Sequence, residues 1–319
     1  MSDYSFRVLL ADQIAPEGIR VLEEAAGIQV DERAGIDVSE LEAAIGNYDA
    51  LIVRSRTRVT AAILEAGQRL RVVGRAGVGL DNIDVDAAAK RGIAVLNAPA
   101  GNVVSAAELT MALMLSLVRH VPQAAASLKR GEWERNRFKG VELHGKTLGL
   151  IGAGRIGAEV AKRALAFGMQ VIIHDPYLSD ERARDIGAEL VTFHELFRAA
   201  DLVSIHTPLT EETRGLIGAD QLAMMKPTAY LINAARGGVV DETALVEALQ
   251  KGELAGAALD VFEEEPVAAD NTLLRLDNVI AIAHLGAATH EAQTLSGIEI
   301  CKAVRDALVT SDSRPAVGV

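Results

Sequence analysis

The chain has 319 residues, 50% of them hydrophobic and only 3% aromatic, so it is long enough for two folded domains and too apolar for a disordered protein. Its net charge of -12 would repel phosphates, which argues against a nucleic-acid partner. The one cysteine excludes a disulfide framework, and neither a signal peptide nor a run of about 20 apolar residues is seen, so we expect a cytoplasmic protein with no metal and no membrane partner.

Residues 6–98 alternate short β-rich runs with helical ones, a pattern typical of a parallel sheet covered by helices. The strand-like runs are residues 7–11, 28–30, 50–54, 71–75 and 93–97, and the helical runs are residues 16–26, 39–45, 61–66 and 85–90. Charged, polar and glycine positions follow two of these strands, at the edge where ligands bind in this architecture. We therefore expect the substrate to contact Arg54, Ser55, Arg75, Gly77 and Val78, and we expect Val78 to contact the cofactor as well.

A buried apolar helix is predicted at residues 105–118, and a second alternating series follows it. This series has six strand-like runs, which begin near residues 146, 170, 201, 228, 255 and 278. Together they are typical of a nucleotide-binding sheet. A last helix is predicted at residues 291–308, where we expect the chain to return to the first domain and the lone Cys301 to be a core residue.

The run G-A-G-R-I-G at residues 152–157 follows an apolar strand and opens a helical run. A bare G-x-G-x-x-G is weak evidence, but this context is that of a dinucleotide-binding turn. Gly152 permits the tight turn, Gly154 lets pyrophosphate approach the backbone, and Gly157 lets helix and strand pack closely. Because a helix N-terminus offers free N–H groups to phosphates, Arg155 and Ile156 are also expected to bind the cofactor.

Asp175 ends the next strand, where a carboxylate can accept hydrogen bonds from the ribose hydroxyls and would repel a 2′-phosphate. This favours NAD over NADP, although an aspartate before a proline could also be a plain turn. The run His206, Thr207 and Pro208 ends another strand, and proline there keeps the chain out of helix beside the cofactor. We expect these three residues to form a wall of the cofactor site, with Thr207 as a hydrogen-bonding contact.

Three further residues follow strand-like runs of the second series: Arg236 in I-N-A-A-R-G-G, Glu265 in F-E-E-E-P and His284 in A-H-L-G. A guanidinium can hold the carboxylate of a 2-oxo acid and polarise its carbonyl. An imidazole can transfer the proton near neutral pH, and a carboxylate beside it fixes its tautomer. Each residue alone is ordinary, but together with a dinucleotide motif they predict the catalytic set of a hydride-transfer enzyme.

Over nearly its whole length the chain resembles the D-isomer-specific 2-hydroxyacid dehydrogenases, and most closely the D-3-phosphoglycerate dehydrogenases. The resemblance is carried by R-A-G-V-G-L-D-N-I-D, G-K-T-L-G-L-I-G-A-G-R-I-G, N-A-A-R-G-G, L-D-V-F-E-E-E-P and H-L-G-A-A-T. It implies oxidation of D-3-phosphoglycerate to 3-phosphohydroxypyruvate in serine biosynthesis, a homodimer made through the NAD domains, and catalysis by the arginine, glutamate and histidine named above. It also implies that Asp260 and the backbone around Ala234 line the nicotinamide, and we expect Gly286 to contact the cofactor as well.

We accordingly expect an α/β chain of two doubly wound parallel-sheet domains, the larger a Rossmann NAD-binding domain. Residues 1–98 and 289–319 are expected to form a discontinuous, flavodoxin-like substrate domain, and residues 99–288 the NAD-binding domain. The chain ends at Val319, so neither a C-terminal regulatory domain nor feedback inhibition by serine is expected.

A phosphorylated three-carbon acid needs more cations around it than lactate does. Arg54, Arg75 and the basic run at residues 135–139 are the candidates, and the resemblance implies that Arg135 reaches across a dimer interface, although the run could equally be a solvated loop. Ala283, where these enzymes often carry proline, and Ala234, where some carry cysteine, leave room for another substrate. The alternatives are a glyoxylate or hydroxypyruvate reductase, a D-lactate dehydrogenase, or a corepressor-like protein that binds NAD and partners. No G-x-S-x-G turn supports a hydrolase.

Overall fold

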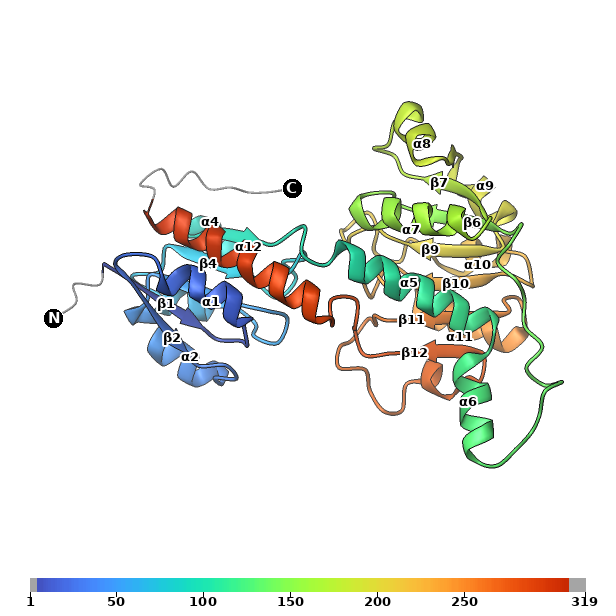
Figure 1. The fold of residues 1–319 in the computed structure, drawn as a ribbon, viewed down its shortest axis with the longest axis horizontal. Helices are drawn as coiled ribbons and strands as arrows, with labels where there is room; N and C mark the ends of the chain where they lie inside the picture. The colour runs from blue at the N-terminus through green and yellow to red at the C-terminus, as the bar shows by residue number, and fades with distance from the viewer. Residues whose placement is uncertain (1–4, 310–319) are drawn as a thin grey trace. The chain divides into compact units, whose positions relative to one another are not determined.

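The computed structural model describes residues 5–309 and divides into two compact units (Figure 1). Unit 1 comprises Met1–Val103 and Ala287–Val319, and unit 2 comprises Val104–Gly286. The sequence predicts divisions after residues 98 and 288, and the structure places them after Val103 and Gly286. Unit 2 is therefore one uninterrupted segment, whereas unit 1 is assembled from two.

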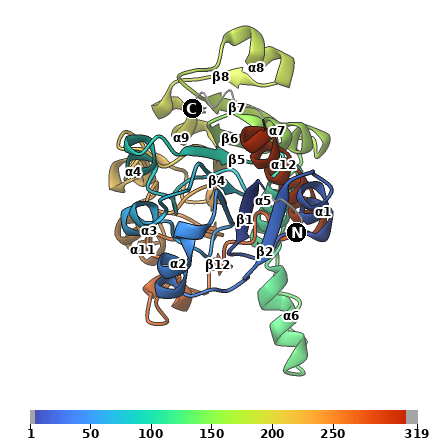
Figure 2. The same ribbon diagram turned by 90° about the vertical axis from the view of Figure 1, so that its left-hand side faces the viewer.

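Unit 1 is built on a parallel sheet of five strands in the order β2-β1-β3-β4-β5, which confirms the predicted doubly wound sheet. The strands are β1 (Phe6–Leu10), β2 (Ile28–Glu32), β3 (Ala50–Val53), β4 (Val72–Arg75) and β5 (Ala94–Asn97). Helices α1 (Pro16–Glu23) and α12 (His290–Val309) cover one face of this sheet. Helices α2 (Val38–Ala44), α3 (Ala61–Ala66) and α4 (Val85–Lys90) cover the other face, with the short 3-10 helix η1 (Ile45–Asn47) after α2 (Figure 2).

Helix α12 packs against α1 through a close approach of two glycines. A Cβ on Gly18 would lie 2.6 Å from the carbonyl carbon of Gly297, so the two backbones can come this close only because residue 18 has no side chain. Farther along α12, Ile300, Cys301 and Val304 are fully buried in the core of unit 1. The last helix thus completes that core, and Cys301 is a buried core residue as predicted.

Unit 2 is built on a parallel sheet of seven strands in the order β12-β11-β10-β9-β6-β7-β8. The strands are β6 (Thr147–Ile151), β7 (Gln170–His174), β8 (Glu189–Leu190), β9 (Leu202–Ile205), β10 (Tyr230–Asn233), β11 (Gly256–Leu259) and β12 (Val279–Ala281). The strand order reverses between β6 and β9, and this switch point is where open α/β sheets bind ligands. The order confirms the predicted Rossmann sheet.

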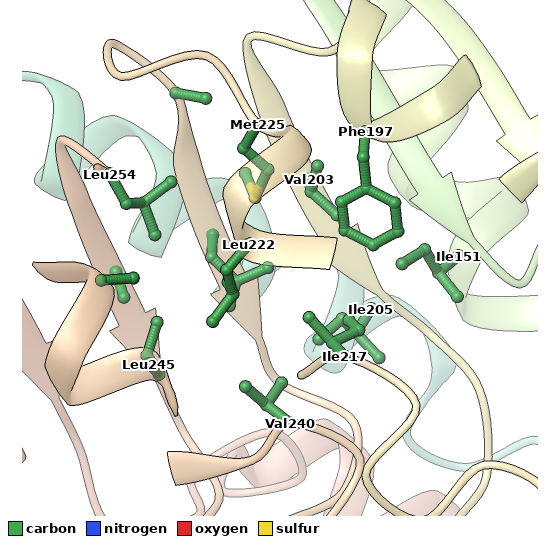
Figure 3. Close-up of a cluster of buried hydrophobic side chains, with 14 of the residues drawn as sticks. Ile151, Phe197, Val203, Ile205, Ile217, Leu222, Met225, Val240, Leu245 and Leu254 are labelled. Carbon is green, nitrogen blue, oxygen red and sulfur yellow. The ribbon is translucent and has the colours of Figure 1, made fainter. Parts of the chain in front are cut away.

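The helices of unit 2 cover both faces of its sheet. Helices α5 (Val103–Val118) and α7 (Arg155–Ala166) pack on one face, and α9 (Phe193–Ala199), α10 (Ala219–Met224), α11 (Glu242–Lys251) and the 3-10 helix η2 (Thr272–Arg275) pack on the other. Helices α6 (Val121–Lys129) and α8 (Asp180–Ile186) complete the unit. Figure 3 shows the core between the sheet and this second set of helices, where Phe197 of α9 lies beside Val203 of β9, and Leu222 of α10 and Leu245 of α11 belong to the same cluster.

The structure differs from the sequence-based expectation in two elements of unit 2. Strand β8 is a seventh strand that was not predicted, because two residues are too few to show an alternating pattern. Helix α6 was not predicted either, since it presents a mixed surface with only Ser127 buried. The six expected strands of this unit are all present.

No single helix among residues 5–309 is long and apolar enough to cross a membrane. By length and composition alone, α5 and α6 pass such a test as a pair, although they are bent by 62° at the break between them. The cytoplasmic location expected from the sequence stays a prediction.

Candidate active site

The loop between β6 and α7 has the geometry of a dinucleotide-binding turn. Gly152 has a φ of +85°, a conformation that favours glycine, and its N–H donates to the carbonyl of His174 at 2.9 Å. A Cβ on Gly157 would lie 2.5 Å from the Gly152 carbonyl oxygen, whereas a Cβ on Gly154 would meet nothing within 4 Å. The loop is therefore closely packed at its third glycine and open at its second, which fits a pyrophosphate beside the helix N-terminus.

Asp175 follows β7 and braces the same loop. Its Oδ2 accepts a hydrogen bond from the N–H of Ala153 at 2.9 Å, and its Oδ1 accepts one from the N–H of Tyr177 at 2.9 Å. Since the two oxygens of a carboxylate can accept about four hydrogen bonds, both keep capacity for ribose hydroxyls. A negative charge at this place fits NAD, whose ribose carries no 2′-phosphate.

His206 follows β9 and packs beside the glycine loop. Its Nε2 lies 2.9 Å from the Oγ of Ser204, and burial lowers the pKa of the His206 imidazole from 6.5 to about 4. The imidazole is therefore neutral near pH 7. A Cβ on Gly152 would lie 2.9 Å from the carbonyl oxygen of His206, so this residue contacts the loop. Of the next two residues, Thr207 is half-buried and Pro208 is exposed.

Arg236 lies in the turn between β10 and α11. Asn233, the buried last residue of β10, braces this turn: its Nδ2 donates to the carbonyl of Arg236 at 2.9 Å and its Oδ1 accepts from the N–H of Ala235 at 3.1 Å. A Cβ on Gly237 would overlap the carbonyl of Phe262. Glycine is thus required for the turn to lie against the loop that follows β11.

That loop carries Glu265, which contacts His284 directly. The Nδ1 of His284 lies 2.7 Å from Glu265 Oε2, and Glu265 Oε1 accepts from the N–H of Phe262 at 3.1 Å. Burial raises the pKa of the Glu265 carboxyl, but the hydrogen bond and charge of His284, the N–H of Phe262 and, least, the charge of Arg236 outweigh it and leave the pKa below its ordinary value. Because an ionised carboxylate only accepts, the Nδ1 of His284 carries the proton of this hydrogen bond.

Asp260 holds the backbone around His284. Its carbonyl accepts from the N–H of His284 at 2.8 Å, and its fully buried carboxylate accepts from the N–H groups of Leu285 at 2.6 Å and Gly286 at 2.9 Å. Burial raises the pKa of the Asp260 carboxyl, and these backbone groups offset part of that rise. His284 has a φ of 50°, which is uncommon for a residue with a side chain, and the three hydrogen bonds stabilise it.

The predicted substrate residues of unit 1 follow β3 and β4. Arg54 comes directly after β3 and lines a small pocket that is partly open to solvent. Arg75 ends β4, and its guanidinium lies where a Cβ on Gly77 would stand. Ser55 is exposed, and the carbonyl of Val78 accepts from Asn97 Nδ2 at 2.7 Å.

Sequence reasoning missed three polar residues of this pocket, Gln13, Gln293 and Ser296, of which Ser296 lies on α12 like Gln293. Gln13 lies in the loop after β1, and Gln293 lies in the first turns of α12. These segments are far apart in the chain and meet only in the folded unit, so none of these residues forms part of a local motif.

Arg135 lies in unit 2, in the loop between α6 and β6. Its neighbours Glu132 and Glu134 form ion pairs with Arg130 at 2.8 Å and Arg137 at 3.0 Å. Within the described part of unit 2, no hydrogen bond or ion pair joins Arg135 to the glycine loop or to the Glu265 and His284 pair. Its side chain is exposed.

Comparison with known proteins gives one family match over more than half of the chain. Residues 111–286 match the family described as D-isomer specific 2-hydroxyacid dehydrogenase, NAD binding domain. Among curated proteins, D-3-phosphoglycerate dehydrogenase of Methanocaldococcus jannaschii is 52% identical over 303 residues, which are 95% of this chain and 57% of that protein. The chain thus spans little more than half the length of this relative.

Solved structures agree with the fold of the chain. The TT0316 protein from Thermus thermophilus is 37% identical, with a TM-score of 0.84 over 92% of this chain and 93% of that one. D-lactate dehydrogenase from Aquifex aeolicus, complexed with NAD and lactic acid, is 31% identical, with a TM-score of 0.82 over 95% of each chain.

Proposed function

Since this chain belongs to the D-isomer-specific 2-hydroxyacid dehydrogenase family, we propose that it oxidises D-3-phosphoglycerate to 3-phosphohydroxypyruvate, as in serine biosynthesis. The contact between His284 and Glu265 carries the proposal, because it joins an imidazole to a carboxylate beside the turn of Arg236. The name of the relative at 52% identity supports the choice of substrate.

His284 is the acid–base residue of the proposed reaction. In the oxidation, its Nε2 accepts the proton of the substrate hydroxyl, and in the reverse direction it returns this proton to the carbonyl oxygen. Glu265 holds the Nδ1 proton and stabilises the imidazolium that forms. NAD, when bound, accepts the hydride that leaves C2 of the substrate.

Arg236 holds the substrate carboxylate through two parallel hydrogen bonds and polarises the neighbouring carbonyl. Its backbone is held by Asn233, and its Nη1 donates to the carbonyl of Ala235 at 2.7 Å, so the guanidinium lies against a braced turn. A lysine at this position would keep the charge but lose the planar fork, which orients a carboxylate.

NAD is held by the loops at the carboxyl ends of the strands of unit 2. Gly152, Gly154 and Gly157, with the first helical residues Arg155 and Ile156, receive the pyrophosphate, and Asp175 receives the ribose. The remaining proposed contacts are the wall residues His206, Thr207 and Pro208, the nicotinamide positions Ala234, Asp260 and Gly286, and Val78 of unit 1. The open space at Gly154 and the spare acceptor capacity of Asp175 support this assignment.

The substrate phosphate is assigned to cations outside the catalytic set. In unit 1 these are Arg54 and Arg75, with Ser55, Gly77 and Val78 on the same loops. The pocket beside Arg54 supports this choice, since it offers polar side chains next to a guanidinium. Arg135 is proposed to reach the phosphate from a second copy of the chain, so the active protein is a homodimer.

A substrate panel tests the proposal. We expect 3-phosphohydroxypyruvate to be reduced with NADH at a kcat/KM about a hundredfold above that of hydroxypyruvate, glyoxylate and pyruvate, because binding a multiply charged substrate tail uses cations that the others do not need. An equal or reversed order would keep a dehydrogenase but discard this substrate. Tight NADH binding with no turnover of any acid would favour a binding protein instead.

A further inference from the structure

Asn82 is a half-buried residue whose side chain connects the loops that carry two arginines of unit 1. Its Nδ2 donates to the carbonyl of Arg54 at 2.7 Å and to the carbonyl of Thr57 at 2.6 Å. Its Oδ1 accepts from the Nε of Arg75 at 3.2 Å. One amide group therefore restrains the backbone after β3 and the guanidinium at the end of β4.

Asp12 holds the same loop from its other side. Its buried carboxylate accepts from the backbone N–H of Arg54 at 2.6 Å, and also from the N–H of Thr57 at 3.3 Å and from its Oγ1 at 2.9 Å. The backbone of Arg54 is thus fixed at its N–H by a carboxylate and at its carbonyl by an amide. These hydrogen bonds hold the backbone of Arg54 and not its side chain, which lines the pocket.

The side chain of Asn82 is not needed for the local pairing of the chain. The N–H of Val59 donates to the carbonyl of Asn82 at 2.8 Å, and the N–H of Asp84 donates to the carbonyl of Val59 at 2.9 Å. These backbone bonds join the two segments without the amide. All three side-chain hydrogen bonds instead go to the backbone after β3 or to a guanidinium.

We propose that Asn82 is a positioning residue, which sets the direction of Arg54 and the orientation of Arg75 for binding the anionic tail of the substrate. The inference rests on the proposed function for the identity of that anion. It adds a residue that contacts no substrate itself and acts through the two arginines. Asp12 holds the N–H side of the same Arg54 backbone, so Asn82 acts on a loop that is already held at one end.

Two substitutions of Asn82 test whether its side chain orients the two arginines or only fills space in the loop. Asn82→Asp keeps the shape of the side chain but places oxygens against two carbonyls, and Asn82→Ala removes all three hydrogen bonds. We expect both to raise the KM for 3-phosphohydroxypyruvate about tenfold, with kcat changed about twofold or less, because the lost interaction acts on binding. The matched control is Asn47→Ala, an exposed asparagine of unit 1 whose side chain donates only to the nearby Ala44 carbonyl at 3.3 Å.

The selectivity between substrates distinguishes positioning from general damage. The kcat/KM for hydroxypyruvate, which lacks the phosphate, should change about threefold or less in both variants, and the Kd for NADH should be unchanged. Equal losses for both substrates, or an Asn82→Asp protein that behaves like wild type, would overturn the inference.

Hydrogen–deuterium exchange gives a readout that does not depend on activity. In the intact protein, the amides of residues 54–58 should exchange faster in Asn82→Ala than in wild type or Asn47→Ala, because the loop loses one of its two anchors. Unchanged exchange would contradict the inference. If the wild-type protein reduced no 2-oxo acid, the proposed function would fail, while this measurement would still decide whether Asn82 holds the loop.

Discussion

His284 is fixed on two sides, by Glu265 at its imidazole and by Asp260 at its backbone. In the proposed function, this arrangement would hold the ring so that Nε2 can meet a substrate hydroxyl. Because the backbone of residue 284 is held through its own N–H and those of the next two residues, replacing the side chain should leave these hydrogen bonds in place.

The first prediction concerns that side chain. His284→Ala should lower kcat by about 10²–10⁴-fold, the range expected when a positioned acid–base group is lost, while the Kd for NADH stays within about twofold of wild type. Steady-state kinetics and a fluorescence titration of NADH measure the two quantities. His290→Ala, at the first residue of α12, is the matched control, and turnover near that of wild type would remove His284 from the mechanism.

The second prediction concerns His206, whose pKa burial lowers from 6.5 to about 4. Between these two values the unfolded chain binds a proton that the folded chain does not, so stability should fall as the pH is lowered through this range. His206→Asn should lack this contribution. Thermal unfolding at about pH 7 and about pH 5 should therefore show a larger loss of Tm in wild type than in the variant, and parallel losses would contradict the burial of a neutral imidazole.

The residues of the candidate site differ in how well the sequence alone predicts their roles. Arg236, Glu265 and His284 follow strand-like runs and belong to specific motifs, so the sequence places them at the carboxyl edge of the sheet. Asn82 also lies in a motif, R-A-G-V-G-L-D-N-I-D, but its role depends on hydrogen bonds to a loop 25 and 28 positions away. No local pattern indicates such contacts.

At the level of elements, the glycines in the turn from β6 into α7 differ in why a side chain would be unfavourable there. Gly157 is needed for packing within the protein, since a Cβ there would press on the Gly152 carbonyl. A Cβ on Gly154 would meet nothing within 4 Å, so packing does not require glycine there, and the proposed pyrophosphate would be the reason for it. The sequence motif alone cannot tell these two requirements apart.

The third prediction separates them. Gly154→Ala should leave the Tm within about 1 °C of wild type and weaken NADH binding about tenfold or more, because the methyl group occupies only the ligand's space. Gly157→Ala should lower both Tm and NADH affinity. Gly218→Ala, where a Cβ meets nothing closer than 3.7 Å, is the control for the substitution itself. A Gly154→Ala protein that binds NADH normally would place the pyrophosphate elsewhere.

Elements differ in how well periodicity reveals them. The strands of both sheets carry apolar runs between helices, which is why their order of appearance is readable from sequence. Strand β8 has two residues, one of them exposed, and α6 buries only Ser127 of its nine residues, so neither has a face that an amphipathic pattern could mark. The sheet order, in contrast, follows from tertiary pairing and from the known preferences of α/β folds.

On the scale of the whole molecule, the segment of α6 and the following loop carries large exposed apolar side chains. Trp133, with 78% of its surface exposed, lies near Val121 and Leu128 in the sequence, and both of these are also exposed. Clustered exposed apolar residues mark interaction sites. A second copy of the chain is the partner proposed for this segment.

The fourth prediction uses the fact that Trp133 is the only tryptophan of the chain. If the homodimer buries this segment, the tryptophan emission should shift to shorter wavelength as the protein concentration rises, in parallel with the dimer fraction from sedimentation. Trp133→Asp should shift the protein towards monomer, since a charge would be desolvated in the interface. Tyr177→Asp, at an exposed aromatic residue after β7, is the control. A dimer with a fully solvated tryptophan would require a different interface.

The division of the chain also bears on the order in which it folds during synthesis. Unit 2 is encoded by one continuous stretch, whereas the core of unit 1 needs Ile300, Cys301 and Val304, which leave the ribosome after the whole of unit 2. Because domains generally fold as units while the chain emerges, we expect the second unit to reach its native state first. Until α12 arrives, the part of the first sheet that α12 covers beside α1 is exposed to solvent, and a chaperone that binds apolar surface would find its target there.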